Sequence, residues 1–140
     1  MKEEIVKKFQ DRFEWFPKHN PLYIKDTAPM WIDCDEGWFD LIWKLCEDID
    51  AVVKREGLTD FSVDQIKEKF AGLRFYVSGA NQEVFDLIRK AEEQSYKICE
   101  KCGKKGSMYI GFGWYRTLCA KCAKSDTKRT WVKVKKEAKL

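Results

Sequence analysis

The sequence predicts an α+β fold in which about three main helices accompany a small antiparallel sheet. Three segments, 3–16, 36–57 and 81–97, carry apolar residues at the spacing of amphipathic helices. Other segments combine short apolar runs with glycine, which is typical of strands joined by tight turns. A chain of 140 residues with 44% hydrophobic residues is also long enough to bury a core of its own, as a single domain.

The first predicted helix, residues 3–16, is defined by an apolar stripe that ends at a proline. Its inward positions repeat every three or four residues and stop before Pro17; they are Ile5, Val6, Phe9, Phe13 and Phe16. Residues 17–35 contain three prolines and no clean period, so we expect an ordered loop there. This loop is expected to pack through Leu22, Tyr23, Met30 and Trp31.

The other two predicted helices have recognisable start and stop signals. In residues 36–57 the acidic side chains come early, Lys54 and Arg55 come late, and Gly57 follows. This order agrees with the helix dipole and with glycine as a helix stop. The helix over residues 81–97 begins at Asn81, a good N-cap residue, and leads directly into a cysteine-rich segment.

Residues 61–79, FSVDQIKEKFAGLRFYVSG, admit two interpretations. In the first, Ser62 caps a short helix that runs through Phe70 and stops at Gly72, and a strand follows over residues 73–78. In the second, a hairpin turns at Ala71 and Gly72, pairing Lys69 with Arg74 and Lys67 with Tyr76. The hairpin places Glu68 on an apolar face, which the helix avoids. We therefore expect the helix, with the hairpin as the alternative.

Four cysteines form the most specific pattern in the chain, C-x2-C-x16-C-x2-C. Cys99 and Cys102 make the first pair, and Cys119 and Cys122 make the second. The start of the chain, MKEEIVKK, has no apolar run of a secretion signal, so we expect a cytoplasmic protein in which disulfides do not persist. Two close pairs at this spacing are typical of a zinc ribbon. Because four thiolates complete a tetrahedral site, the zinc is expected to be structural and not catalytic.

The segment between the cysteine pairs, SMYIGFGWYRTL, predicts two short strands joined by a glycine turn. It is unusually rich in aromatic residues, namely Tyr109, Phe112, Trp114 and Tyr115. These rings would form either a small core around the metal or a surface on which bases stack. The two remaining cysteines, Cys34 and Cys46, belong to no motif and are expected to be buried and inert.

Charge divides the chain into an acidic body and a basic end. Residues 1–96 hold 14 basic and 20 acidic side chains, whereas residues 97–140 hold 13 basic and 3 acidic ones. We therefore expect an acidic body over residues 1–96, a zinc-ribbon module over residues 97–126 and a basic tail over residues 127–140, packed as one compact unit. Such an asymmetry favours an anionic partner, either a nucleotide or a nucleic acid.

Evidence for catalysis is weak in this sequence. His19 is the single histidine, so no Cys-His or Ser-His pair is predicted beyond it. An acidic group that includes Asp33 and Asp35 would suit a divalent ion for phosphodiester hydrolysis. Acidic residues at a helix start are more simply partners of the helix dipole. We therefore favour binding over an enzymatic activity.

Three sequence features together carry a resemblance. The stretch GWFDLIWKLCEDI is followed by KEKFAGLRFY and by a helix that runs into a CxxC pair and GWYRTLC. This combination resembles a group of small proteins of unassigned function from bacteriophages and bacterial genomes, over roughly residues 37–122. The resemblance implies a phage-type protein in the host cytoplasm that binds host machinery or a nucleotide signal of host defence. The contacts that we would then expect for the ligand are Lys67, Lys69, Arg74 and Tyr76.

Three functions follow from these features. The first is a non-catalytic zinc-containing protein that binds an anionic nucleotide through the KEKF-x-x-LRFY segment. The second is a zinc-ribbon protein that binds nucleic acid through its basic end, with an affinity that falls steeply with salt. The third is an adaptor or inhibitor that binds a host protein. No stretch is long and apolar enough to predict a membrane partner, and the oligomeric state is left open.

Overall fold

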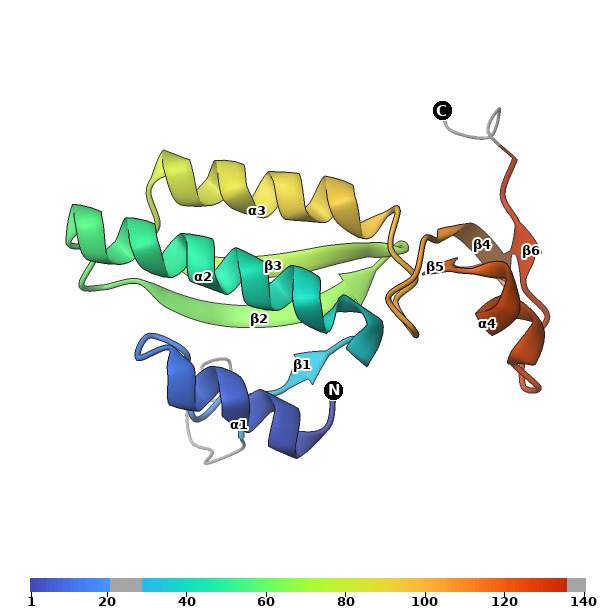
Figure 1. Ribbon diagram of the computed structural model, residues 1–140, viewed down its shortest axis with the longest axis horizontal. Helices are drawn as coiled ribbons and strands as arrows, with labels where there is room; N and C mark the ends of the chain where they lie inside the picture. The colour runs from blue at the N-terminus through green and yellow to red at the C-terminus, as the bar shows by residue number, and fades with distance from the viewer. Residues whose placement is uncertain (21–28, 136–140) are drawn as a thin grey trace.

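The computed structural model describes residues 1–20 and 29–135, which fold into a larger body and a smaller module (Figure 1). We call residues 1–96 the body and residues 97–135 the module. The elements of the body are α1 (Glu3–Arg12), β1 (Ile32–Asp33), the 3-10 helix η1 (Glu36–Trp38), α2 (Phe39–Glu56), β2 (Ser62–Lys69), β3 (Gly72–Ser78) and α3 (Gln82–Ser95). Those of the module are β4 (Ser107–Gly111), β5 (Trp114–Leu118), α4 (Ala120–Ser125) and β6 (Val132–Lys133). The predicted α+β class is confirmed.

Each part contains a sheet of three strands. The body sheet has the order β1-β2-β3, and α2 and α3 lie side by side along the β2–β3 hairpin (Figure 1). Strands β2 and β3 are antiparallel, but β1 runs parallel to β2, so the prediction of an antiparallel sheet is wrong for this strand. The module sheet has the order β5-β4-β6 and is antiparallel throughout.

A helix was expected over residues 62–70, but residues 62–69 form strand β2 and Phe70 lies in the turn that follows. The partner of β2 is β3, as in the hairpin interpretation, but the register differs: Lys67 pairs with Arg74, and Lys69 pairs with Gly72. The turn lies one residue earlier than expected, at Phe70 and Ala71, which both have positive φ angles of 52° and 74°. The helix prediction is therefore wrong, and the alternative is right in kind but not in register.

The helix ends follow local sequence signals. The Asn81 side chain accepts a hydrogen bond from the Val84 N–H at 3.0 Å and so caps α3 as predicted. Gly57 ends α2 in the left-handed conformation, with a φ of 64°. Helix α1 ends at Arg12, earlier than the expected Phe16, although Phe16 is still buried. Within the described residues no helix has both the length and the apolar character needed to cross a membrane.

The core of the body lies between its helices and the inner face of the sheet. Helix α1 contributes Phe9, whose ring contacts those of Phe39 and Trp43 at centroid distances of 5.5 and 5.0 Å. Of the residues expected to hold the loop before β1, Met30 is buried, whereas Trp31 is 44% exposed. Leu22 and Tyr23 lie outside the described residues.

One buried carboxylate joins α2 to the N-terminal segment. The side chain of Asp50 is 9% exposed and lies 2.9 Å from the Lys54 ammonium and 3.6 Å from the Arg12 guanidinium. It also accepts a hydrogen bond of 2.9 Å from the Trp15 indole N–H. Burial alone would raise the pKa of Asp50, but the hydrogen bonds from Lys54 and Trp15 and the nearby positive charges lower it below its ordinary value.

We expect Asp50→Asn to lower the free energy of unfolding by about 1–3 kcal/mol at neutral pH, because it removes the charge that Lys54 and Arg12 face. A lowered folded-state pKa stabilises the fold above the unfolded-state pKa, and this contribution is lost as the pH falls through the folded-state value. Urea unfolding should therefore show the difference between the two proteins shrinking below about pH 4. A constant difference from neutral to acidic pH would contradict this account. Asp48→Asn, at an exposed pair with Lys44, is the control and should change little.

Candidate metal centre and the adjoining groove

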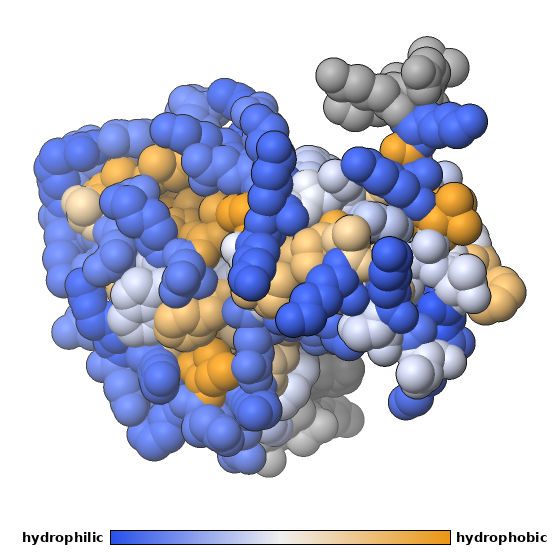
Figure 2. Space-filling model, turned by 45° about the vertical axis from the view of Figure 1, so that its right-hand side comes forward, coloured by the Kyte–Doolittle hydropathy of each residue, from blue (hydrophilic) through white to orange (hydrophobic). Residues whose placement is uncertain are grey.

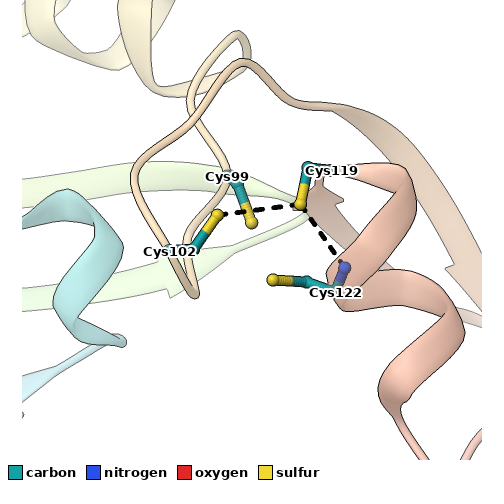
Figure 3. Close-up of side chains that lie close together, drawn as sticks. All are labelled: Cys99, Cys102, Cys119 and Cys122. Carbon is teal, nitrogen blue, oxygen red and sulfur yellow. Dashed lines mark hydrogen bonds between the residues drawn. The ribbon is translucent and has the colours of Figure 1, made fainter.

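The four cysteines of the predicted zinc ribbon come together in the structure. Cys99 and Cys102 lie in the turn after α3, and Cys119 and Cys122 lie at the start of α4 (Figure 3). All four sulfur atoms lie within 4.8 Å of one another, and the Sγ atoms of Cys102 and Cys119 are 3.6 Å apart. The cluster can therefore hold a single metal ion.

The spacing of the sulfur atoms matches a tetrahedral metal site. Thiolates about 2.3 Å from a zinc ion at the corners of a tetrahedron lie about 3.8 Å from each other. The 3.6 Å between Cys102 and Cys119 is close to that value, and it is far longer than the roughly 2.05 Å of a disulfide bond. With four sulfur donors the coordination shell is complete, so a metal here would stabilise the module and leave no position for a catalytic water.

Backbone geometry places the sulfur atoms. Gly103 has a φ of 82° and donates its N–H to the Cys99 carbonyl at 2.9 Å, which makes the tight turn of the first pair. In the second pair, the Cys122 N–H donates to the Cys119 sulfur at 3.4 Å. This N–H lowers the pKa of Cys119 to about 7, whereas burial raises that of Cys122 to about 12. A bound cation would favour the thiolate form of both.

The module has a small hydrophobic core beside the cysteines. Its buried members are Cys99, Tyr109, Leu118 and Ala123, and Trp131 packs against them. From the sequence, the aromatic residues of this segment were expected either in a core or on a stacking surface. The structure places some of them in each. Tyr109 is in the core, whereas Phe112 and Trp114 are 81% and 63% exposed.

Among the hydrogen bonds that join the module to the body, three link residues far apart in the sequence and end on backbone carbonyls. The Gly37 N–H donates to the Glu100 carbonyl at 2.7 Å. The Trp38 indole N–H donates to the Ile98 carbonyl at 2.8 Å. From the module side, the Thr117 hydroxyl donates to the Ala71 carbonyl, at the tip of the β2–β3 hairpin, at 2.8 Å. The first cysteine turn is thus in contact with η1, and β5 is in contact with the hairpin.

A buried ion pair lies in the same contact between body and module. The Glu100 carboxylate is nearly buried, accepts a hydrogen bond of 3.0 Å from the Asp35 N–H and lies 3.1 Å from the Arg116 guanidinium. Burial raises the pKa of Glu100, although the charge of Arg116 acts in the opposite direction. Arg116 also pairs with the Asp35 carboxylate. Asp35 is therefore engaged in this contact, which weakens its candidacy as a ligand of a catalytic divalent ion.

The structure brings the four expected ligand contacts onto one face of the β2–β3 hairpin. Lys67, Lys69, Arg74 and Tyr76 alternate with the core residues of the two strands. The Arg74 side chain is only 19% exposed, lies 3.1 Å from the Glu92 carboxylate and donates to the Tyr96 hydroxyl at 3.3 Å. Its guanidinium is thus already held by α3, which leaves fewer donors for an anion. Tyr76 is 43% exposed.

A groove of about 510 Å³ lies next to the cysteine cluster and combines the exposed ring of Trp114 and the partly buried ring of Trp131 with basic side chains. The residues that matter here are Glu68, Lys101, Trp114, Lys128, Arg129 and Trp131. Arg129 lies against both tryptophans, with its guanidinium carbon 5.7 and 5.4 Å from the ring centroids of Trp114 and Trp131. Figure 2 shows hydrophobic patches among hydrophilic side chains on this module. Sequence reasoning noted the charge and Trp114, but not the groove.

The residues after the second cysteine pair complete the groove. Strand β6 pairs with β4, Val132 with Ile110 and Lys133 with Tyr109, so this part of the expected basic tail belongs to the module sheet. Residues 136–140 lie outside the described part of the chain.

Comparisons of the chain with protein-family models, curated proteins and solved structures find no match. The site must therefore be interpreted from its own geometry.

Proposed function

We propose that this protein is a non-catalytic binding protein, that zinc holds its module together, and that the module binds single-stranded nucleic acid. The observation that carries the proposal is the groove beside the metal centre, where the 63% exposed ring of Trp114 lies among basic side chains. Single-stranded nucleic acid offers both bases that stack and phosphates that need positive charge. The groove provides a partner for each.

Zinc is the metal that this donor set suits best. Four thiolates select soft or borderline ions, and zinc is the usual occupant of a tetrahedral four-cysteine site in a reducing compartment. Only four residues of the module, Cys99 among them, form its buried core, so the packing of side chains alone contributes little stability. A structural zinc ion would supply the missing folding free energy.

The groove has the two elements that sequence-tolerant binding of single strands requires. Lys101 and Lys128 line it and are free to approach phosphates from the exposed surface. Trp114 offers a face for a base, and stacking on such a ring contributes about 1–3 kcal/mol per base. The module as a whole is strongly basic, since residues 97–140 hold 13 basic and 3 acidic side chains.

A nucleotide bound on the β2–β3 hairpin is the second candidate. Lys67, Lys69 and Tyr76 share a face there, in agreement with the contacts that the phage resemblance implied. The support is weaker, because the Arg74 guanidinium is paired with Glu92. A role against host defence, and a host protein as partner, stay predictions of that resemblance.

We expect Trp114→Ala to weaken binding of a fluorescently labelled single-stranded oligonucleotide by about tenfold, because the variant loses one stacking contact. Fluorescence anisotropy at several salt concentrations measures this. The dependence of affinity on salt should stay unchanged, because the variant keeps every basic side chain. Phe85→Ala on α3, where the ring is 48% exposed, is the matched control and should bind normally. Equal affinities for the Trp114 variant and the parent protein would contradict the proposal.

A further inference from the structure

We propose that the groove selects bases that carry an exocyclic amino group, and that Glu68 is the residue that selects them. The inference rests on the proposed function, since it concerns the base that stacks in the same groove. Glu68 comes from β2 of the body, whereas the other residues named in the groove come from the module. The selecting group and the stacking ring thus come from different parts of the molecule.

The Glu68 carboxylate is oriented by the hairpin turn that it belongs to. One of its oxygens, Oε2, accepts a hydrogen bond of 2.9 Å from the Ala71 N–H. A carboxylate has about four acceptor positions on its two oxygens, so a single N–H leaves it able to accept further hydrogen bonds. Because Glu68 lines the groove, this remaining capacity is available to a bound base.

The second acidic residue of the groove is less suited to this role. Asp126 accepts from the Trp131 indole N–H with Oδ2 at 2.8 Å and from the Lys128 N–H with Oδ1 at 2.9 Å. Both of its oxygens therefore hold the local structure of the segment before β6. Of the two acidic side chains that line the groove, Glu68 therefore keeps the larger capacity to accept hydrogen bonds.

The chemistry of the bases decides which ones Glu68 accepts. Cytosine carries an amino group at C4, which donates to a carboxylate, whereas thymine carries a carbonyl oxygen there. A base stacked on Trp114 with its C4 edge towards Glu68 would gain a charge-assisted hydrogen bond if it is cytosine. Thymine would place two acceptors against each other. In a duplex the same amino group is paired, and the base cannot reach the ring of Trp114.

The test compares oligo(dC) with oligo(dT) of about eight nucleotides, within the range of site sizes of single-strand binders. The two probes differ at C4 and in the thymine methyl group, and a mildly alkaline pH keeps cytosine unprotonated. We expect oligo(dC) to bind about tenfold more tightly, the effect of one hydrogen bond to a charged group. In Glu68→Gln the preference should disappear, because the amide both donates and accepts. Its oxygen can still accept from the Ala71 N–H.

Each outcome has one meaning. Binding of neither probe overturns the proposed function together with this inference. Equal binding of both probes by the parent protein overturns the inference alone and leaves the proposed function standing. A preference for oligo(dC) that persists in Glu68→Gln also overturns it, because another group must then select the base. Glu93→Gln, an exposed acid on α3, is the control for loss of one charge and should keep the preference.

Discussion

Replacing Cys102 by serine is expected to release the metal and to unfold the module. A serine hydroxyl is a far poorer zinc ligand than a thiolate, and metal binding in small modules supplies folding free energy of about 10 kcal/mol or more. The buried core of the module has only four members, too few to replace that contribution. Metal analysis should show less than one zinc per chain, and hydrogen exchange should show loss of protection over residues 97–135.

The body should survive this change, because its core is separate from that of the module. Its helices are expected to keep their circular dichroism signal and a cooperative unfolding transition. Cys46→Ala is the matched control, since this thiol is fully buried in α2 and far in sequence from the four cysteines of the cluster. That variant should lose stability and keep its zinc. A Cys102→Ser protein with full metal content and a protected module would show that the cluster is not a four-thiolate site.

Gly37→Ala is expected to cost about 2–4 kcal/mol and to loosen the module from the body. A Cβ atom at this position would lie 2.3 Å from the carbonyl oxygens of both Cys99 and Glu100. These are backbone atoms of the cysteine turn, so no side chain can move aside to make room. The backbone of Gly37 does not have a positive φ angle, so the loss would come from this contact and not from conformational strain.

Urea unfolding and metal content together test this prediction. Zinc should remain bound in Gly37→Ala, because the variant leaves all four thiolates in place. Binding of oligonucleotides should weaken, because Glu68 and the module line one groove only while they stay in contact. The neighbouring variant Glu36→Ala removes an exposed side chain 3.9 Å from Lys2 and is expected to change stability by less than about 0.5 kcal/mol. Equal stabilities for the two variants would contradict the role assigned to Gly37.

The cysteine cluster could be predicted from the sequence because its geometry is local. Each pair needs only one turn of chain to bring two sulfurs together, and Gly103 marks the first of these turns. Helices α2 and α3 were also predictable, since Gly57 and Asn81 act within one turn of the helix ends. Signals of this kind depend only on residues that are close in the sequence. They therefore predict local structure correctly even where the tertiary contacts are unknown.

The β2–β3 hairpin was open to the sequence only as an alternative, and its register could not be predicted, because the two turn residues are not the usual ones. Phe70 and Ala71 both adopt positive φ angles, which glycine and asparagine adopt more readily. Gly72 instead allows close packing against the end of α3, since a Cβ atom there would lie 2.4 Å from the Tyr96 hydroxyl oxygen. A strand was disfavoured because it places Glu68 on the apolar face of the hairpin. In the structure the Glu68 carboxylate accepts a hydrogen bond from the Ala71 N–H. The contact of Gly72 with the end of α3 and the hydrogen bond within the turn thus favour the hairpin over the helix. The spacing of apolar residues does not reveal either of them.

The groove was beyond sequence reasoning because its residues are far apart in the chain. Glu68 lies in the body, Trp114 lies in β5, and Trp131 lies just before β6. They meet because contacts such as the Thr117 bond to the hairpin tip hold the module beside the body, and because β6 returns to β4. The sequence does show that the basic side chains are concentrated after residue 96.

The position of the module at one end of the longest axis has a consequence for how the protein meets a charged partner (Figure 1). Of the described residues, 1–20 and 29–96 have a net charge of −6 and 97–135 one of +9, so their charges form an electric dipole along that axis. The field of a polyanion turns such a dipole before contact, presenting the positive end and repelling the negative one. For the nucleic-acid partner that we propose, encounters would therefore begin with the module in front. Added salt should therefore lower the association rate constant more than it raises the dissociation rate constant.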